Sequence, residues 1–144
     1  IENMPLASGV ADVVVSNCVL NLVPDKSQAF AETFRILKKG GHFSVSDIVL
    51  VGELPEGLQK SAEMYAGCVS GAIQKKEYLG IIEKTGFINT VIQKEKRIVL
   101  PDEILSEHLT KEEIQEFNTG NTGIFSVTVF AEKSDSCCGP GCCN

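Results

Sequence analysis

The stretch DVVVSNCVLNLVPDKSQAFAETFRILKKGGHFSVSDIVL, residues 12–50, decides the fold. It opens on a valine-rich apolar run, which is typical of a strand buried on both faces of a parallel sheet. A helical pattern follows, in which Asp25 can cap the first turn and Gln28 stands at the capping-box position. We expect this helix to run for about 14 residues and to end at the glycines 40–41, before a second strand over 42–50. Strand, helix and strand together predict a crossover unit and an α/β fold.

The remaining pattern extends this unit with three helical segments and two strands. Apolar spacing and turn residues predict helices over 57–73 and 75–87, a strand over 88–100, a short helical pair over 102–117, and a final strand, antiparallel to its neighbours, over 123–133.

Composition limits the possible partners. The chain has 13 lysines and arginines against 19 aspartates and glutamates, a formal net charge of −6 at pH 7, and its basic residues form short scattered pairs. We therefore expect no nucleic-acid partner, because phosphate binding needs clustered positive charge. No run approaches the roughly 20 apolar residues of a membrane span, so no membrane partner is expected. Two of the six cysteines lie far apart and four crowd the last eight residues, which favours reduced thiols and a cytoplasmic setting over a disulfide framework.

Several segments resemble a known family. FRILKKGGHFSVSD, residues 34–47, is similar to the helix-Gly-Gly-strand passage of class I S-adenosylmethionine-dependent methyltransferases. VVSNCVLNLVPDK (14–26) and AEMYAGCVSGAI (62–73) narrow the resemblance to the arsenite methyltransferases, and the ending GIFSVTVFAEK and the cysteine-rich terminus agree with it. The resemblance implies an α/β fold, the carboxyl-terminal part of a Rossmann-like class I methyltransferase sheet with flanking helices. It implies a partial methyltransferase domain over 1–133 and a flexible cysteine-rich tail over 134–144.

The family also carries features that this sequence does not contain. These are a glycine-rich G-x-G-x-G turn that holds the cofactor, an acidic residue that binds its ribose, and a third arsenic-ligand cysteine. We therefore expect the chain to correspond to the carboxyl-terminal half of such an enzyme and to be inactive alone. An unpaired apolar sheet edge would then favour self-association, or pairing with the missing half.

The resemblance implies methyl transfer from S-adenosylmethionine to thiolate-bound trivalent arsenic, with arsenite or its thiol conjugates as substrate and cellular thiols as reductants. Cys18 and Cys68, fifty residues apart (68 minus 18), would be the catalytic arsenic ligands. Asn17 and Cys18 would face the methionyl end of the cofactor, and Ile1 and Glu2 would lie beside its adenine. Further arsenic ligands are expected in the tail, at Cys137, Cys138, Cys142 and Cys143.

The residues themselves leave alternatives open. Cys18 follows a predicted strand, where ligands bind in open α/β sheets, but cysteine is also among the most buried residue types. Cys68 lies off the apolar stripe of its predicted helix and could equally fill a helix contact. Asp47 is either a pocket residue or a strand end. Neither histidine is expected to be catalytic, because His42 opens a predicted strand and His108 lies in an acidic segment that should be exposed.

The role of the tail cysteines and the function of the whole chain also have alternative interpretations. The vicinal tail cysteines do not have the C-x-x-C spacing of zinc sites, and they either capture arsenic or have no function. Two other functions remain: a non-enzymatic module that binds arsenic or soft metals, and a methyltransferase for another small molecule.

Overall fold

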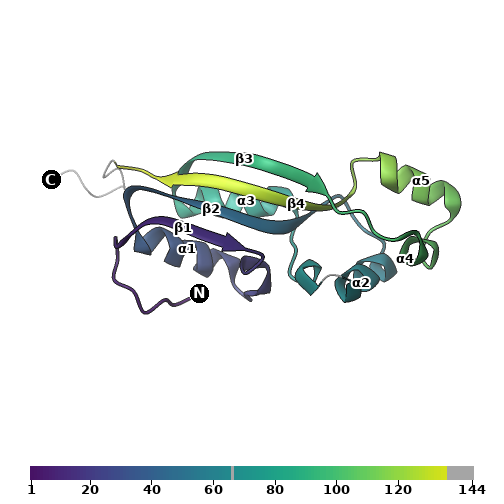
Figure 1. The fold of residues 1–144 in the computed structure, drawn as a ribbon, viewed down its shortest axis with the longest axis horizontal. Helices are drawn as coiled ribbons and strands as arrows, with labels where there is room; N and C mark the ends of the chain where they lie inside the picture. Colours follow the sequence, from purple (N-terminus) through teal and green to yellow (C-terminus); the bar gives the residue numbers. More distant parts are fainter. Residues whose placement is uncertain (66, 136–144) are drawn as a thin grey trace.

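A four-stranded mixed sheet organises the molecule, which is described by a computed structural model over residues 1–65 and 67–135. Its strands lie in the order β1-β2-β4-β3 (Figure 1). β1 is parallel to β2, whereas β4 is antiparallel to both β2 and β3. The strands are β1 (Ala11–Asn17), β2 (Leu37–Val51), β3 (Phe87–Arg97) and β4 (Gly123–Lys133). The α/β prediction, with its antiparallel final strand, is therefore confirmed.

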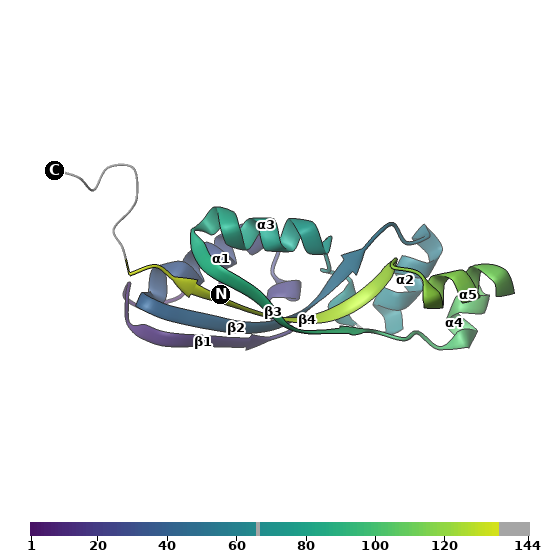
Figure 2. The same cartoon turned by 90° about the horizontal axis from the view of Figure 1, so that it is seen from above.

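The two longest helices lie side by side on one face of the sheet, and the smaller helices gather at its far end (Figure 2). The long pair are α1 (Lys26–Ile36) and α3 (Lys75–Thr85). The far end holds α2 (Glu56–Tyr65), α4 (Asp102–Ser106) and α5 (Lys111–Thr119). Two 3₁₀ turns complete the fold, η1 (Leu20–Leu22) and η2 (Gly67–Val69). None of the described helices is long and apolar enough to cross a bilayer.

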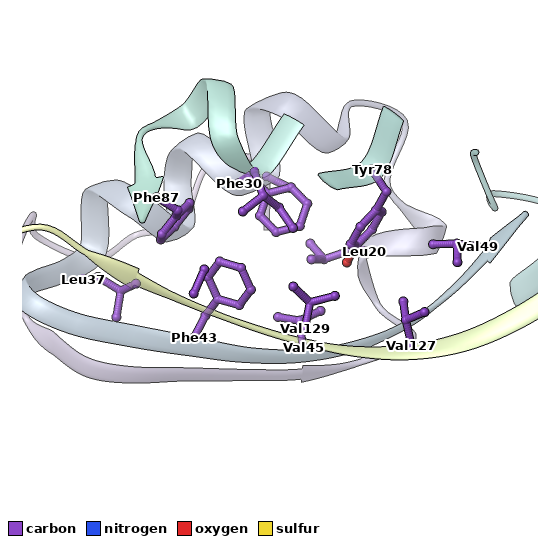
Figure 3. Packing of buried hydrophobic residues seen from close by; sticks show 13 residues of the cluster. Leu20, Phe30, Leu37, Phe43, Val45, Val49, Tyr78, Phe87, Val127 and Val129 are labelled. Atoms are coloured by element: carbon purple, nitrogen blue, oxygen red, sulfur yellow. The ribbon is translucent and has the colours of Figure 1, made fainter. Parts of the chain in front are cut away.

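Two apolar clusters share strand β2. The first lies between the sheet and the α1–α3 pair, where the Phe30 ring meets the edge of Tyr78 at a centroid distance of 5.5 Å (Figure 3). The second lies at the far end and includes Leu50 of β2, Leu58 of α2 and Leu105 of α4. Because β2 contributes to both clusters, it connects the helical face to the far end.

Helix α1 begins as the sequence predicts, with one difference in its cap. The Asp25 carboxylate accepts a hydrogen bond from the Gln28 backbone N–H at 2.9 Å. The Gln28 side chain does not complete a capping box, because its amide donates to the Glu2 carbonyl at 3.1 Å.

The end of α1 was predicted too late. The helix stops at Ile36, and Leu37 already belongs to β2, opposite Ala11. Lys133 of β4 fixes this end, since its ammonium donates to the carbonyls of Phe34 and Leu37 at 2.7 and 2.8 Å. The pair 40–41 therefore lies inside the strand and does not end the helix.

The predicted helix over 57–73 is also broken. It is replaced by α2 and the turn η2, after which the chain extends. The Leu50 N–H donates to the Ile73 carbonyl at 2.9 Å, so this segment leaves the helical path to bond to β2. Leu58, Ala62 and Val69 of the predicted stripe are buried nonetheless.

One face of β1 is open, contrary to the prediction of a strand buried on both faces. Val13 is 46% exposed and Val15 is 76% exposed. Both long helices lie on one face of the sheet, and no described helix covers the other face along β1 (Figure 2). Across the sheet, Val15 pairs with Ser44, Ser44 with Phe130, and Phe130 with Val91, so three of the four residues in this row are apolar.

This open face and the outer edge of β1, which pairs with no other described strand, lead us to expect concentration-dependent self-association. Val15→Lys should weaken it roughly tenfold, because burying one valine is worth about 1.5 kcal/mol. Val99→Lys is the matched control, since Val99 is 71% exposed and lies outside the strands. Light scattering over a dilution series measures the effect, and a monomer at every concentration would contradict the expectation.

Candidate functional site at the carboxyl end of β1

Cys18 is the first residue after β1, at the edge of the sheet where the sequence placed it. Its backbone has φ 57°, in the left-handed region that few residues other than glycine adopt. The Cys18 N–H donates to the Ser46 carbonyl at 2.7 Å, which holds the turn against β2. The side chain is half-buried and packs against the second apolar cluster, to which Val69 belongs. The thiol therefore lies at a strained turn and not in the middle of a core.

Asn17 ends β1 with an exposed side chain and pairs with Ser46 of β2. The Ser46 hydroxyl is hydrogen-bonded to that of Thr128 at 2.8 Å. This row of polar residues continues across the sheet at its open face. Asn17 is thus exposed at the end of β1, and its role beside the cofactor stays a prediction.

A buried carboxylate lies one residue beyond Ser46. Asp47 is fully buried, and its Oδ2 accepts a hydrogen bond from the Tyr78 hydroxyl at 2.7 Å. Its Oδ1 has no hydrogen-bond partner among the described residues. Burial raises the pKa of Asp47 to about 6, although the Tyr78 hydroxyl, the Asn21 backbone N–H and the charge of Lys26 each lower it.

The Tyr78 hydroxyl donates to the buried Asp47 carboxylate. Burial raises the pKa of its phenol far above the usual range, and the negative charges of Asp47 and of a Cys18 thiolate add to this effect. Tyr78 therefore remains a hydrogen-bond donor at neutral pH. The sequence indicated Asp47 but missed Tyr78, because Tyr78 occupies an ordinary apolar position of α3.

Cys68 lies in η2, and its side chain is outside the described residues. The backbone of this segment approaches the Cys18 turn, because a Cβ at position 71 would overlap the Asn21 carbonyl oxygen. The structure thus brings together the two chain segments that carry Cys18 and Cys68. The predicted tail ligands, Cys137, Cys138, Cys142 and Cys143, lie outside the described residues.

Glu2 lies against the start of α1, where its carbonyl accepts a hydrogen bond from the Gln28 side chain. The Glu2 carboxylate accepts a hydrogen bond from the Asp25 N–H at 2.7 Å, so it has a structural partner. Ile1 is 41% exposed.

A partly buried ion pair on α1 holds residues 4–6 against the helix. Glu32 accepts hydrogen bonds from the Arg35 guanidinium and from the Met4 N–H, the latter at 2.8 Å, and these bonds lower the pKa of Glu32 to about 2. Arg35 also donates to the Leu6 carbonyl at 2.7 Å. These hydrogen bonds hold residues 4–6 against α1.

Both histidines contact neighbouring side chains, and His108 is exposed, as the sequence predicts. The His42 ring packs on Phe130 at a centroid distance of 5.0 Å, and a His108 ring nitrogen is hydrogen-bonded to the Ser61 hydroxyl at 2.7 Å. In the part of the chain that the structure describes, no cluster of three or more histidine, cysteine or acidic side chains could hold a metal ion. A groove of about 860 Å³ between α1 and α3 is lined by none of the predicted site residues.

Comparison with known proteins identifies the fold. Residues 1–86 match the family described as "Methyltransferase domain". The chain belongs to this methyltransferase family. It is 45% identical to human arsenite methyltransferase over 76 residues, 53% of this chain and 20% of that protein. It is 33% identical to the arsenite methyltransferase of Aquipseudomonas alcaligenes over 109 residues, 76% of this chain and 32% of that protein.

A solved methyltransferase structure agrees with these relatives. The arsenic(III) S-adenosylmethionine methyltransferase of Chlamydomonas reinhardtii superposes with a TM-score of 0.69 at 25% identity, covering 95% of this chain and 40% of that one. The predicted resemblance to arsenite methyltransferases and the predicted class I methyltransferase fold are confirmed. S-adenosylmethionine is likewise confirmed as the cofactor of the family. The chain spans a fifth to a third of the length of these two curated methyltransferases.

The backbone of Cys18 generates a prediction about stability. Because φ at this position is 57°, glycine should relieve strain, and Cys18→Gly should be more stable than Cys18→Ala by about 1 kcal/mol. At Val19, where φ is −78°, the order should reverse by about 0.5–1 kcal/mol. Urea unfolding of the four variants measures both differences. Equal stability of the two Cys18 variants would contradict the left-handed conformation.

The raised pKa of Asp47 predicts a pH-dependent stability. Between the ordinary value of 3.8 and about 6, the unfolded chain loses the Asp47 proton and the folded chain keeps it, so stability falls as pH rises. Asp47→Asn stays neutral and can still accept from Tyr78. The stability of the variant relative to the parent chain should therefore increase by roughly 2–2.5 kcal/mol from pH 4 to pH 7. Urea unfolding of both proteins across this range tests it, and a difference independent of pH would contradict it.

Proposed function

We propose that the chain takes part in methyl transfer from S-adenosylmethionine to thiol-bound trivalent arsenic. One observation carries the proposal: the Cys18 turn and the Cys68 segment meet at the carboxyl end of β1, in a chain related to arsenite methyltransferases. Ligands of open α/β sheets bind at this edge.

Cys18 and Cys68 are the proposed arsenic ligands. Trivalent arsenic is soft, and soft centres prefer thiolates to nitrogen or oxygen ligands. When arsenite, As(OH)₃, exchanges two hydroxyl groups for two cysteine thiols, two As–S bonds form and two water molecules leave. The bound arsenic keeps its lone pair, which is the nucleophile of the proposed reaction.

The contribution of the chain to the reaction is then orientation. A thiol pair that fixes arsenic also fixes the direction of its lone pair, and such alignment can lower a barrier by roughly 7–11 kcal/mol. No general base is required, because the lone pair is already available. The structural surroundings of His42 and His108 agree with this mechanism.

The described residues fit one side of an S-adenosylmethionine site. The exposed Asn17 side chain and the Cys18 turn, both at the strand end, would lie on the methionyl side, and Ile1 and Glu2 would lie on the adenine side. The main chain of these first two residues is the part proposed to face adenine, because the Glu2 carboxylate is occupied by the Asp25 N–H. When bound, the cofactor supplies an electrophilic methyl group on a sulfonium.

The proposal includes two further partners. Methylation formally oxidises arsenic, so thiol reductants must return it to the trivalent state, as in a reducing cytoplasm. The tail cysteines could capture arsenic and pass it to the Cys18–Cys68 pair, because a short tether gives local concentrations of order mM.

Mass spectrometry with arsenite tests the proposal. The test uses the full chain with all four tail cysteines replaced by serine. This protein should bind one arsenic atom. Cys18→Ser or Cys68→Ser should each abolish this binding, because one thiol cannot chelate. Val19→Ser, at an exposed neighbouring position, should leave it unchanged.

Three outcomes bear on the function. A methylated arsenic product after addition of S-adenosylmethionine supports the enzyme, whereas arsenic binding without product fits both a module that binds arsenic or soft metals and an enzyme fragment that is inactive alone. Undiminished arsenic binding after both cysteine substitutions would contradict the proposal and would favour a methyltransferase for another small molecule.

A further inference from the structure

The two cysteine-bearing segments touch through their backbones at one point. Asn21 lies three residues after Cys18, and Gly71 lies three residues after Cys68. A Cβ on residue 71 would overlap the Asn21 carbonyl oxygen, so the segments approach more closely than any side chain at 71 would allow. Glycine is therefore required here by the contact, and not by an unusual φ.

Each segment is separately fastened to strand β2. Asn21 is 2% exposed, and its side-chain amide donates to the Ile48 carbonyl at 3.0 Å. On the other segment, the Ile73 carbonyl accepts from the Leu50 N–H at 2.9 Å. The two residues of β2 that make these hydrogen bonds, Ile48 and Leu50, are two positions apart. The two segments therefore contact β2 and also contact each other at Asn21 and Gly71.

A further contact between Asn21 and β2 involves the Asn21 backbone. The Asn21 backbone N–H faces the buried Asp47 carboxylate, which also accepts from Tyr78 at 2.7 Å. The residues around Asn21 are thus held to β2 through both its backbone and its side chain. Such support is what a ligand pair needs, because a misplacement of about 1 Å can reduce activity roughly 100-fold.

We propose that Asn21 and Gly71 are positioning residues, which set the separation of Cys18 and Cys68 so that both thiols bind one arsenic atom. This inference rests on the proposed function. In it, Asn21 and Gly71 do not bind arsenic themselves, but they determine the distance between the two cysteines that do. The alternative is that both residues serve folding alone. The two roles differ in their effect on two-thiol chelation by the folded chain.

Phenylarsine oxide distinguishes these roles, because it needs two thiols. Its oxygen leaves as water with the two thiol protons, and two As–S bonds form. The test uses the full chain with the four tail cysteines replaced by serine. Gly71→Ala should raise the dissociation constant for phenylarsine oxide at least tenfold. The rate at which iodoacetamide alkylates Cys18 and Cys68, one thiol at a time, should change less than twofold.

Gly67→Ala is the matched control, because residue 67 adjoins Cys68 and a Cβ there meets no atom within 4 Å. It should bind phenylarsine oxide as the parent chain does. Asn21→Ala provides a second variant that adds no volume, and it should weaken chelation in the same direction. Circular dichroism identifies the variants that remain folded, and urea unfolding reports any separate loss of stability.

The outcomes separate this inference from the proposed function. Parental affinity for phenylarsine oxide in folded Gly71→Ala, or in folded Asn21→Ala if the glycine variant unfolds, overturns the positioning role and leaves the proposed function standing. A parent chain that binds phenylarsine oxide equally well after Cys18→Ser overturns both. Weakened chelation with unchanged single-thiol alkylation supports the inference.

Discussion

The pairing of strand β2 with both of its neighbours is the constraint on which the structure depends. β2 runs from Leu37 to Val51, parallel to β1 on one side and antiparallel to β4 on the other. Its alternate side chains enter the cluster under α1 and α3, and its last residues enter the cluster at the far end. The carbonyl of Ile48 and the N–H of Leu50 then hold the two cysteine-bearing segments. Core and candidate site are therefore built on one strand.

Much of the fold could be predicted because its signals are local. Apolar runs and apolar spacing marked the strands, and Asp25 marked the start of α1. The errors came from long-range contacts that carry no local signal. Helix α1 ends early because Leu37 pairs with Ala11 in the sheet, and the predicted helix over 57–73 breaks because Ile73 bonds to β2. Tertiary pairing overrides helical propensity at both places.

Some residues of the candidate site could be predicted from the sequence and others could not. Cys18 and Asn17 could be found because they lie at the end of a recognisable strand. Asp47 was predicted to be a pocket residue or a strand end, and the strand-end alternative is wrong because β2 continues to Val51. Tyr78 and Asn21 could not be found, since their importance comes from partners 31 and 27 residues away along the chain. Gly71 looked like one small residue among several, and only the approach of the Asn21 carbonyl gives it a specific role. Sequence patterns thus locate reactive groups more readily than the residues that hold them.

The left-handed backbone of Cys18 has an evolutionary consequence. A chain under selection for stability alone would drift toward glycine at this position, since glycine adopts such a conformation without steric cost. Keeping a thiol here requires a continuing selective benefit that outweighs the conformational penalty. If the chemistry of the site were lost, this turn would be among the first places where mutation could recover stability, and the identity of residue 18 in diverging lineages would record whether the activity persists.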